Sequence, residues 1–124
     1  MQTYHLIDTE NIPKQWFNLL DNPQSQDHVL LFRLSDSQKN YITLDELQDI
    51  TSIGLHIEII DCVHGKPKMN ALDFQLISYV GYLLASDNCE KTIKIYSNDT
   101  GFEPAVEFWQ RRNRFVTLIK AEEL

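Results

Sequence analysis

Short apolar runs alternate with segments of helical spacing along almost the whole chain. Runs rich in Val, Ile, Leu and aromatic side chains predict β-strands. The expected strands cover residues 4–7, 28–34, 56–63, 92–96 and 116–119. Between them, apolar periodicity and capping signals predict helices over residues 13–20, 43–52, 71–85 and 104–112. This alternation predicts right-handed βαβ units, and therefore an α/β fold whose mostly parallel central sheet is covered by helices on both faces.

Three of the expected helices carry further local signals. Pro13 is typical of the first turn of a helix. Thr43, followed three residues later by Glu46, matches a capping box. The segment 71–85 is apolar on nearly every face and contains one charged residue, Asp73, so it predicts a buried helix.

The composition limits the size and class of the protein. The chain has 124 residues, 43% of them hydrophobic, which predicts a single domain over residues 1–124 and excludes intrinsic disorder. No apolar stretch reaches the roughly 20 residues that a membrane span needs, so no membrane partner is expected. The first residues lack the features of a secretory signal, and the expected location is the cytoplasm. Cys62 and Cys89 lack metal-ligand spacing and are expected as reduced thiols.

The charge balance is acidic, with 11 basic against 18 acidic side chains and a net charge of −7. Such a balance argues against a protein that coats nucleic acid through bulk electrostatic attraction. Either the partner is not a polyanion, or the acids gather where a cation needs them.

Acidic side chains follow three of the expected strands. Asp8 and Asp99 come just after the first and fourth strands, and Asp73 lies in the first turn of the helix after the third. Each alone also suits an ordinary strand end, tight turn or helix start, with Asn70 as the helix cap. In a parallel sheet, however, the carboxyl ends of the strands meet at one edge. Carboxylates that converge there without matching basic residues predict a hard divalent cation, Mg²⁺ or Mn²⁺.

Three segments in this order and spacing, residues 6–12, 70–76 and 97–104, resemble the motifs of PIN-like nuclease domains, especially their small bacterial PIN-like and NYN branch. The resemblance covers almost the whole chain. It implies a three-layer α/β/α sandwich and a metal-dependent ribonuclease that hydrolyses single-stranded RNA to products with 5′-phosphate and 3′-hydroxyl ends. It also implies that Asp8, Asp73 and Asp99 are the catalytic, metal-binding acids and that Asn11 is the polar partner of the first.

One position departs from the family pattern. Many NYN domains have another aspartate two residues after the acid that Asp99 resembles, and here that position is Gly101. Glu103, or Glu107 one turn later, is the expected replacement as a metal ligand. If the site is inactive, the chain is instead a degenerate PIN-like module that binds RNA or a protein partner without cleaving it.

Substrate contacts are expected beside the acids. Asn11 and Ser97 are candidate hydrogen-bonding groups, and Lys66 and Lys68 lie in the loop that leads to the Asp73 helix. The two lysines fit phosphate binding and equally fit an ordinary solvated loop. Single-stranded DNA remains open as a substrate, and so does a homodimer that shares a basic surface between its subunits.

The densest basic cluster follows the last expected helix and consists of Arg111, Arg112 and Arg114. These arginines are expected at the opposite edge of the sheet, where they complement a helix C-terminus rather than bind RNA. Trp109 lies on a short amphipathic helix, which predicts core packing for its ring.

A phosphatase or phosphoacceptor domain on a similar sheet is the alternative from another class, with Asp8 as the phosphorylated nucleophile. A haloacid-dehalogenase-like enzyme would have a second aspartate two residues later, where this chain has Glu10. A receiver domain would have its phosphoacceptor after the third strand and an acidic pair after the first. The sequence matches neither pattern well.

Overall fold

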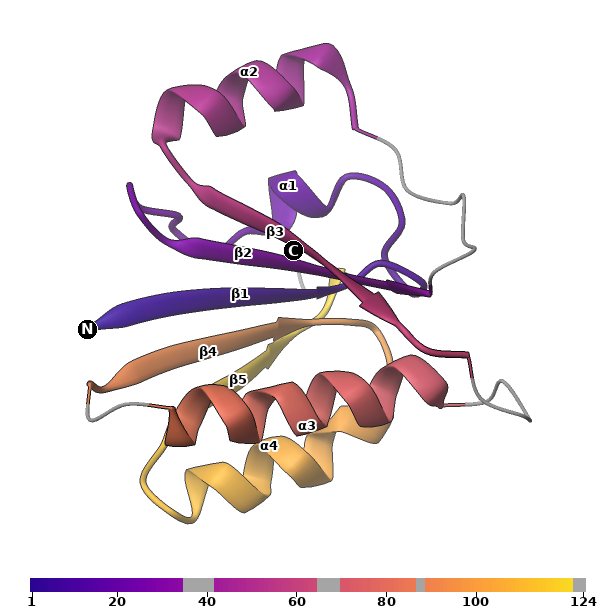
Figure 1. Ribbon diagram of the computed structural model, residues 1–124, viewed down its shortest axis with the longest axis vertical. Helices are drawn as coiled ribbons and strands as arrows, with labels where there is room; N and C mark the ends of the chain where they lie inside the picture. The colour runs from indigo at the N-terminus through magenta and orange to yellow at the C-terminus, as the bar shows by residue number, and fades with distance from the viewer. Residues whose placement is uncertain (35–41, 65–69, 87–88, 122–124) are drawn as a thin grey trace.

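The computed structural model describes residues 1–34, 42–64, 70–86 and 89–121. A five-stranded sheet crosses the molecule in the order β3-β2-β1-β4-β5, and every neighbouring pair is parallel (Figure 1). The strands are β1 (Gln2–Asp8), β2 (His28–Leu34), β3 (His56–Cys62), β4 (Lys91–Tyr96) and β5 (Phe115–Ile119). The strand order reverses between β1 and β4. The chain adds β2 and β3 on one side of β1, and then crosses back to add β4 and β5 on the other side. This makes the carboxyl ends of β1 and β4 the topological switch point, where α/β folds bind their ligands.

Helices cover both faces of the sheet, which confirms the expected three-layer arrangement. In Figure 1, α1 and α2 lie on one side of the strands, and α3 and α4 lie side by side on the other. Their bounds are α1 (Trp16–Leu19), α2 (Leu44–Ile53), α3 (Ala71–Ala85) and α4 (Glu103–Gln110), with a short 3₁₀ helix η1 (Thr100–Phe102) leading into α4.

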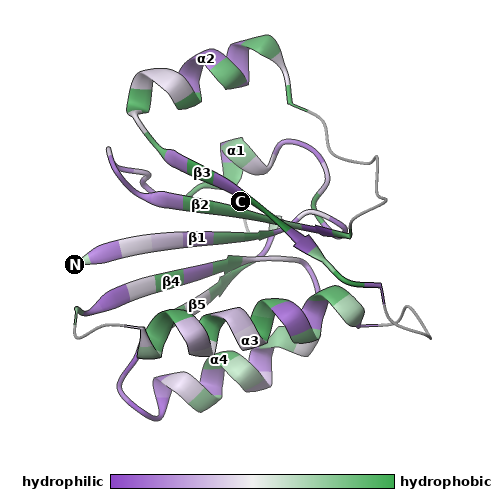
Figure 2. Cartoon of the chain, viewed as in Figure 1, coloured by the Kyte–Doolittle hydropathy of each residue, from purple (hydrophilic) through white to green (hydrophobic). Residues whose placement is uncertain are grey.

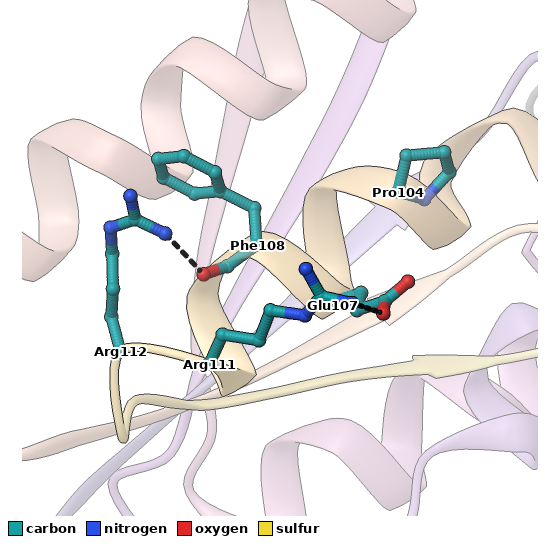
Figure 3. Close-up of a pocket in the computed structure, with 5 residues that line it drawn as sticks. All are labelled: Pro104, Glu107, Phe108, Arg111 and Arg112. Carbon is teal, nitrogen blue, oxygen red and sulfur yellow. Dashed lines mark hydrogen bonds and ion pairs between the residues drawn. The ribbon is translucent and has the colours of Figure 1, made fainter.

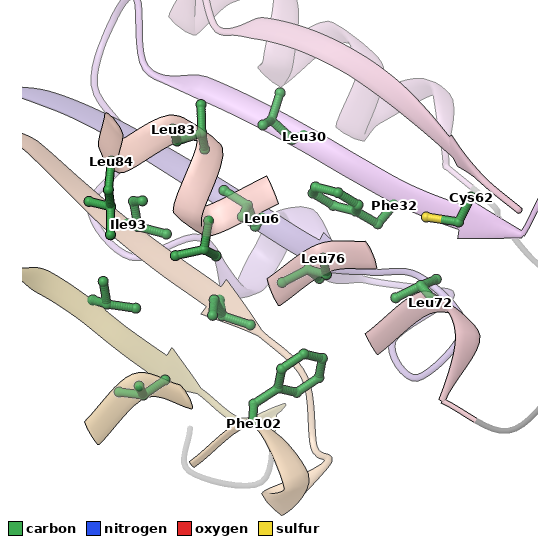
Figure 4. Packing of buried hydrophobic residues seen from close by; sticks show 14 residues of the cluster. Leu6, Leu30, Phe32, Cys62, Leu72, Leu76, Leu83, Leu84, Ile93 and Phe102 are labelled. Carbon is green, nitrogen blue, oxygen red and sulfur yellow. The ribbon is translucent and has the colours of Figure 1, made fainter. Parts of the chain in front are cut away.

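Two hydrophobic clusters join these layers. Alternation along β1 sends Leu6 to the α3/α4 side and Ile7 to the α1/α2 side, and both side chains are fully buried. The cluster on the α3/α4 side includes Leu76 of α3 and Phe102 of η1 (Figure 4). Because Phe102 is part of this cluster, packing against the core holds the segment that follows β4 in place.

A buried polar network ties β1 to β4 on the α1/α2 side. His5 lies with Nδ1 2.7 Å from the Tyr96 hydroxyl and Nε2 2.9 Å from Asp27 Oδ2. Burial lowers the pKa of His5, so the ring is neutral. A carboxylate only accepts hydrogen bonds, so Nε2 donates to Asp27 and the Tyr96 hydroxyl donates to Nδ1. The same hydroxyl accepts a bond of 2.9 Å from the Asp21 amide, which anchors the end of β4.

The capping box predicted for the second helix is confirmed. Thr43 Oγ1 accepts a hydrogen bond of 3.0 Å from the Glu46 amide, and Glu46 Oε1 accepts one of 3.0 Å from the Thr43 amide. At the other end, Gly54 adopts φ 83°, the left-handed conformation that commonly ends helices.

Two helix predictions were wrong in detail. The first helix begins at Trp16 rather than at Pro13, because Gln15 adopts a left-handed conformation with φ 61° that interrupts helical geometry before Trp16 inserts into the core. The long helix α3 is not buried all round. Only the face that includes Leu72, Leu76 and Val80 packs on the sheet, and Figure 2 shows hydrophilic positions between the hydrophobic ones along α3.

Two simpler expectations also bear on the fold. Neither Cys62 nor Cys89 forms a disulfide. No helix in the described part of the chain combines the length and the apolar character needed to cross a membrane.

Candidate active site

The carboxyl ends of β1 and β4 bring Asp8 and Ser97 side by side. The register of the sheet pairs Ile7 with Tyr96, so the residues that follow them, Asp8 and Ser97, both lie at the switch point. Asp8 is only 3% exposed, and Ser97 is fully buried. The Ser97 hydroxyl donates a hydrogen bond of 2.9 Å to Asp8 Oδ2. The side chain of Asp8 is therefore held in one orientation at the edge of the sheet.

Ser97 also links Asp8 to Asp99. Its hydroxyl oxygen accepts a bond of 3.1 Å from the Asp99 amide while its proton is given to Asp8. One buried hydroxyl thus connects two of the predicted acids. The substrate-binding role that we predicted for Ser97 stays untested, but its burial and its two partners favour a positioning role.

Asn11 ties the loop after β1 to the loop after β4. Its backbone amide donates a hydrogen bond of 3.3 Å to Asp8 Oδ1. Its side-chain oxygen accepts a bond of 2.9 Å from the backbone amide of Asn98. Asn98 in turn accepts a bond of 2.8 Å from the Ala121 amide. Sequence analysis assigned no role to Asn98, and its only local signal is its place between two residues predicted to belong to the site. The substrate-binding role that we predicted for Asn11 stays untested, and in the structure its side-chain oxygen holds the two loops together.

Asp99 starts the 3₁₀ turn η1. Its Oδ1 accepts a hydrogen bond of 2.8 Å from the Gly101 amide, which caps the turn. A Cβ atom added at Gly101 would lie 3.0 Å from the same oxygen. A side chain at this position would therefore crowd the carboxylate of Asp99, and the glycine that departs from the family pattern suits the observed orientation of that carboxylate.

Asp73 approaches Asp99 from the first turn of α3. Burial raises the pKa of Asp73 most, and a hydrogen bond with Asp99 and the negative charges of Asp8 and Asp99 add to this effect, so that the pKa reaches about 6. All of these influences raise the pKa, so Asp73 lies in a locally negative field. Asn70, the alternative cap of this helix, adopts φ 63° and makes no side-chain capping bond. Asp73 thus lies next to Asp99 and within the electrostatic reach of Asp8, whereas the shared metal-binding role of the three acids stays a prediction.

Burial also raises the pKa of Asp8, with a smaller contribution from the charge of Asp99, whereas the hydrogen bond from Ser97 lowers it. A carboxylate with a raised pKa is one whose negative charge lacks compensation. Oxygen donors of this kind are the ligands that Mg²⁺ and Mn²⁺ prefer, so the donor type fits such an ion. Within the described ranges, however, no three His, Cys, Asp or Glu side chains are grouped so as to hold a metal ion as they stand.

The remaining predicted site residues lie elsewhere or outside the described ranges. Glu103, the expected replacement ligand, begins α4 and accepts a bond of 2.8 Å from Lys120. Its carboxylate is thus paired with a lysine, and the role that we predicted for Glu103 as a metal ligand stays untested. Lys66 and Lys68 lie outside the residues that the structure describes.

Two of the three arginines of the cluster hydrogen-bond to carbonyl groups at helix ends, as predicted, whereas Arg111 pairs with Glu107. Arg112 donates a bond of 3.0 Å to the carbonyl of Phe108 in α4, and Arg114 donates one of 3.4 Å to the carbonyl of Leu84 in α3. Both arginines therefore complement helix C-termini. Trp109 packs against the α3/α4 cluster, as predicted.

The raised pKa of Asp73 makes the stability of the metal-free protein depend on pH. Its folded value of about 6 lies above the reference value of 3.8, so the folded state binds more protons between these limits. This group's contribution to stability is full below about pH 4 and is lost as the pH rises to about 6. Urea unfolding in a chelator should show wild type losing stability relative to Asp73→Asn over this window. If the two proteins differ by the same free energy of unfolding at every pH from 4 to 7, the raised pKa of Asp73 is contradicted.

The chain was also compared with known proteins. A family model described as a PIN domain matches residues 2–118, which is nearly the whole chain and includes Asp8, Asp73 and Asp99. No curated protein and no solved structure gives a match.

Proposed function

Since the chain belongs to the PIN domain family, we propose that it is a metal-dependent ribonuclease that hydrolyses phosphodiester bonds of single-stranded RNA. The family assignment itself indicates a nuclease-type module. The observation that carries the finer proposal is the approach of Asp73 to the other two acids: burial, a hydrogen bond with Asp99 and the negative charges of Asp8 and Asp99 together raise the pKa of Asp73. Such uncompensated carboxylates suit a site whose charge balance is completed by a cation.

In this proposal the oxygen atoms of Asp8, Asp73 and Asp99 hold Mg²⁺ or Mn²⁺, while Glu103 stays with Lys120. When bound there, such an ion would supply an activated water molecule and would stabilise charge on the phosphoryl and leaving oxygens. The protein supplies the orientation of the ligands. The Ser97 hydroxyl donates to Oδ2 of Asp8, and the backbone amide of Asn11 donates to Oδ1. Ser97 and Asn11 are thus positioning residues, and their support resembles the outer shell that tunes many metal ligands.

The direct test is cleavage of a labelled single-stranded RNA by the purified chain, with Mn²⁺, with Mg²⁺ and with a chelator. We expect cleavage with either ion, none in the chelator, and products with 5′-phosphate ends. A parallel assay with single-stranded DNA of the same sequence decides whether the site accepts RNA, DNA or both. Cleavage that persists in the chelator would refute the metal-dependent mechanism.

Metal binding is also expected to stabilise the folded chain. An ion that binds the folded state alone raises stability by about 2.7 kcal/mol at a hundred times its Kd. Thermal unfolding with increasing Mn²⁺ should therefore show a rising Tm, and Asp99→Asn should reduce this rise. The control Asp49→Asn removes one exposed acid from α2 and should leave the rise unchanged.

A catalytically degenerate module is the second candidate function. It is favoured by the absence, among the described residues, of a side-chain group already arranged to hold a metal, and by the pairing of Glu103 with Lys120. In that case the chain would bind RNA or a protein partner without cleaving it. A Tm that does not respond to Mn²⁺, together with RNA binding in a chelator and no cleavage, would favour this candidate.

A further inference from the structure

The outer face of α4 and the turn after it carries a shallow pocket of about 350 Å³ that the proposed chemistry does not use (Figure 3). Its lining consists of Pro104, Glu107, Phe108, Arg111 and Arg112. These positions are spaced by three and four residues, so they share one face of the helix. We call this set the α4 strip.

Arginine and an aromatic ring are stacked in the α4 strip. The guanidinium carbon of Arg112 lies 3.6 Å from the centroid of the Phe108 ring, and the same side chain donates to the Phe108 carbonyl at 3.0 Å. Phe108 is nevertheless 46% exposed. A flat, exposed pair of this kind offers a surface on which a nucleic-acid base stacks, because bases stack on aromatic rings and on guanidinium planes alike.

Arg111 supplies a second cation next to this stack. Its guanidinium donates to Glu107 at 2.6 Å, and the two side chains are 75% and 60% exposed. An exposed pair of this kind contributes little, so a phosphate group can take the place of Glu107. Guanidinium groups suit phosphate because they present several parallel donors to it.

The α4 strip starts close to the candidate active site along the chain. The turn η1 connects Asp99 directly to α4, and Pro104 follows five residues after Asp99. From Pro104 to Arg112 the strip extends about 12 Å at the helical rise. The arginines therefore lie at the end of α4 that is farther from Asp99, at a separation that suits phosphates a few nucleotides away from the cleaved one.

We propose that the α4 strip binds single-stranded RNA a few nucleotides away from the cleaved bond, with a base stacked on the Arg112–Phe108 pair and a phosphate bound by Arg111. This inference rests on the proposed ribonuclease function, and it adds the route of the substrate across the surface. The chain has a net charge of −7, so phosphate attraction must come from local cations, and adjacent Arg111 and Arg112 provide them. Single-stranded RNA fits better than a duplex, because duplex bases are stacked on each other and cannot reach the ring.

The test measures binding separately from cleavage. Fluorescence anisotropy of a labelled single-stranded oligouridylate is followed in a chelator, so that cleavage does not interfere, for wild type and three groups of variants. Phe108→Ala and Phe108→Leu remove the aromatic face, and the leucine variant keeps apolar bulk so that folding is preserved. Arg111→Gln and Glu107→Gln change the phosphate contact in opposite directions. Lys94→Gln is the matched control, because Lys94 lies on the α1/α2 side of β4 and pairs with Asp21 there.

We expect both Phe108 variants to weaken binding at least about fivefold. Arg111→Gln should weaken binding and lower the slope of log Kd against log salt by about 0.7. Glu107→Gln should tighten binding, and Lys94→Gln should change it little. Double-stranded RNA of the same length should not show the loss with Phe108→Leu.

Two outcomes would overturn the proposal. One is that Phe108 and Arg111 variants bind like Lys94→Gln while metal-dependent cleavage is intact, which would remove the α4 strip as an RNA site and leave the ribonuclease function standing. The other is that wild type does not bind the oligonucleotide at all, in which case the exposed stack is a surface for another class of partner. Absence of both binding and metal-dependent cleavage would refute the proposed function as well.

Discussion

Replacing Asp8 with asparagine is expected to lower kcat/KM for RNA cleavage at least about a hundredfold. Even residues that only support metal ligands typically cost tenfold to a hundredfold when they are changed, and Asp8 is proposed as a ligand itself. Asparagine keeps the size of the side chain and an oxygen that accepts from Ser97 or from the Asn11 amide. What it removes is the negative charge that the cation requires.

This loss of activity should come without a loss of stability. Burial raises the pKa of Asp8, which means that the folded state favours the uncharged form, and asparagine is uncharged. Urea unfolding of Asp8→Asn in a chelator should therefore give a free energy of unfolding equal to or above that of wild type. The control Asp49→Asn makes the same change on the exposed side of α2 and should keep wild-type activity. Full activity in Asp8→Asn would remove Asp8 from the mechanism.

Replacing Phe102 with alanine should produce the largest change in stability, a loss of about 3–5 kcal/mol. Phe102 is fully buried in the α3/α4 cluster, so alanine leaves a cavity where the ring was. A domain of this size is stable by only about 5–15 kcal/mol, and the change therefore removes a large part of the total. Chemical denaturation at 25 °C measures it directly.

The same replacement should also disturb the candidate site in the molecules that stay folded. Phe102 is the last residue of η1, and its amide donates to the carbonyl of Asp99 at 3.4 Å, so the ring anchors the turn that orients Asp99. We expect a weaker rise of Tm with Mn²⁺ in Phe102→Ala than in wild type. Phe115→Ala makes the same change at an exposed position of β5 and should affect both measurements much less. Equal losses in the two variants would contradict this anchoring role.

Much of the fold followed from local patterns. The strand over residues 28–34 and the helix over residues 71–85 have the predicted bounds, and the Thr43 capping box forms as its residues predict. These features depend on short-range periodicity and on contacts within one turn, which are present in the sequence itself. The start of α1 did not follow, because Gln15 adopts a left-handed conformation between Pro13 and Trp16, and the preference of Pro13 for the first turn of a helix does not predict it.

The sequence predicted the acids of the candidate site but not the hydrogen bonds that hold them. Strand ends pointed to Asp8, Asp73 and Asp99, since parallel strands place their carboxyl ends at one edge. The hydroxyl of Ser97 that connects Asp8 to Asp99 could not be found in this way, because the bond joins residues 89 positions apart. The diversion of Glu103 to Lys120 likewise depends on where β5 ends beside α4.

The sequence by itself determined the alternation of strands and helices, the parallel sheet that this implies, and the three acids at the strand ends. Only the tertiary structure decided which oxygen atoms meet, that Gly101 lies against Asp99, and that Arg112 stacks on Phe108. The physical reason is the distance along the chain over which each kind of interaction acts. Hydrophobic periodicity acts between residues that are close along the chain, whereas the electrostatic field at the site arises from groups on β1, α3 and the β4–α4 turn that approach only when the sheet has formed.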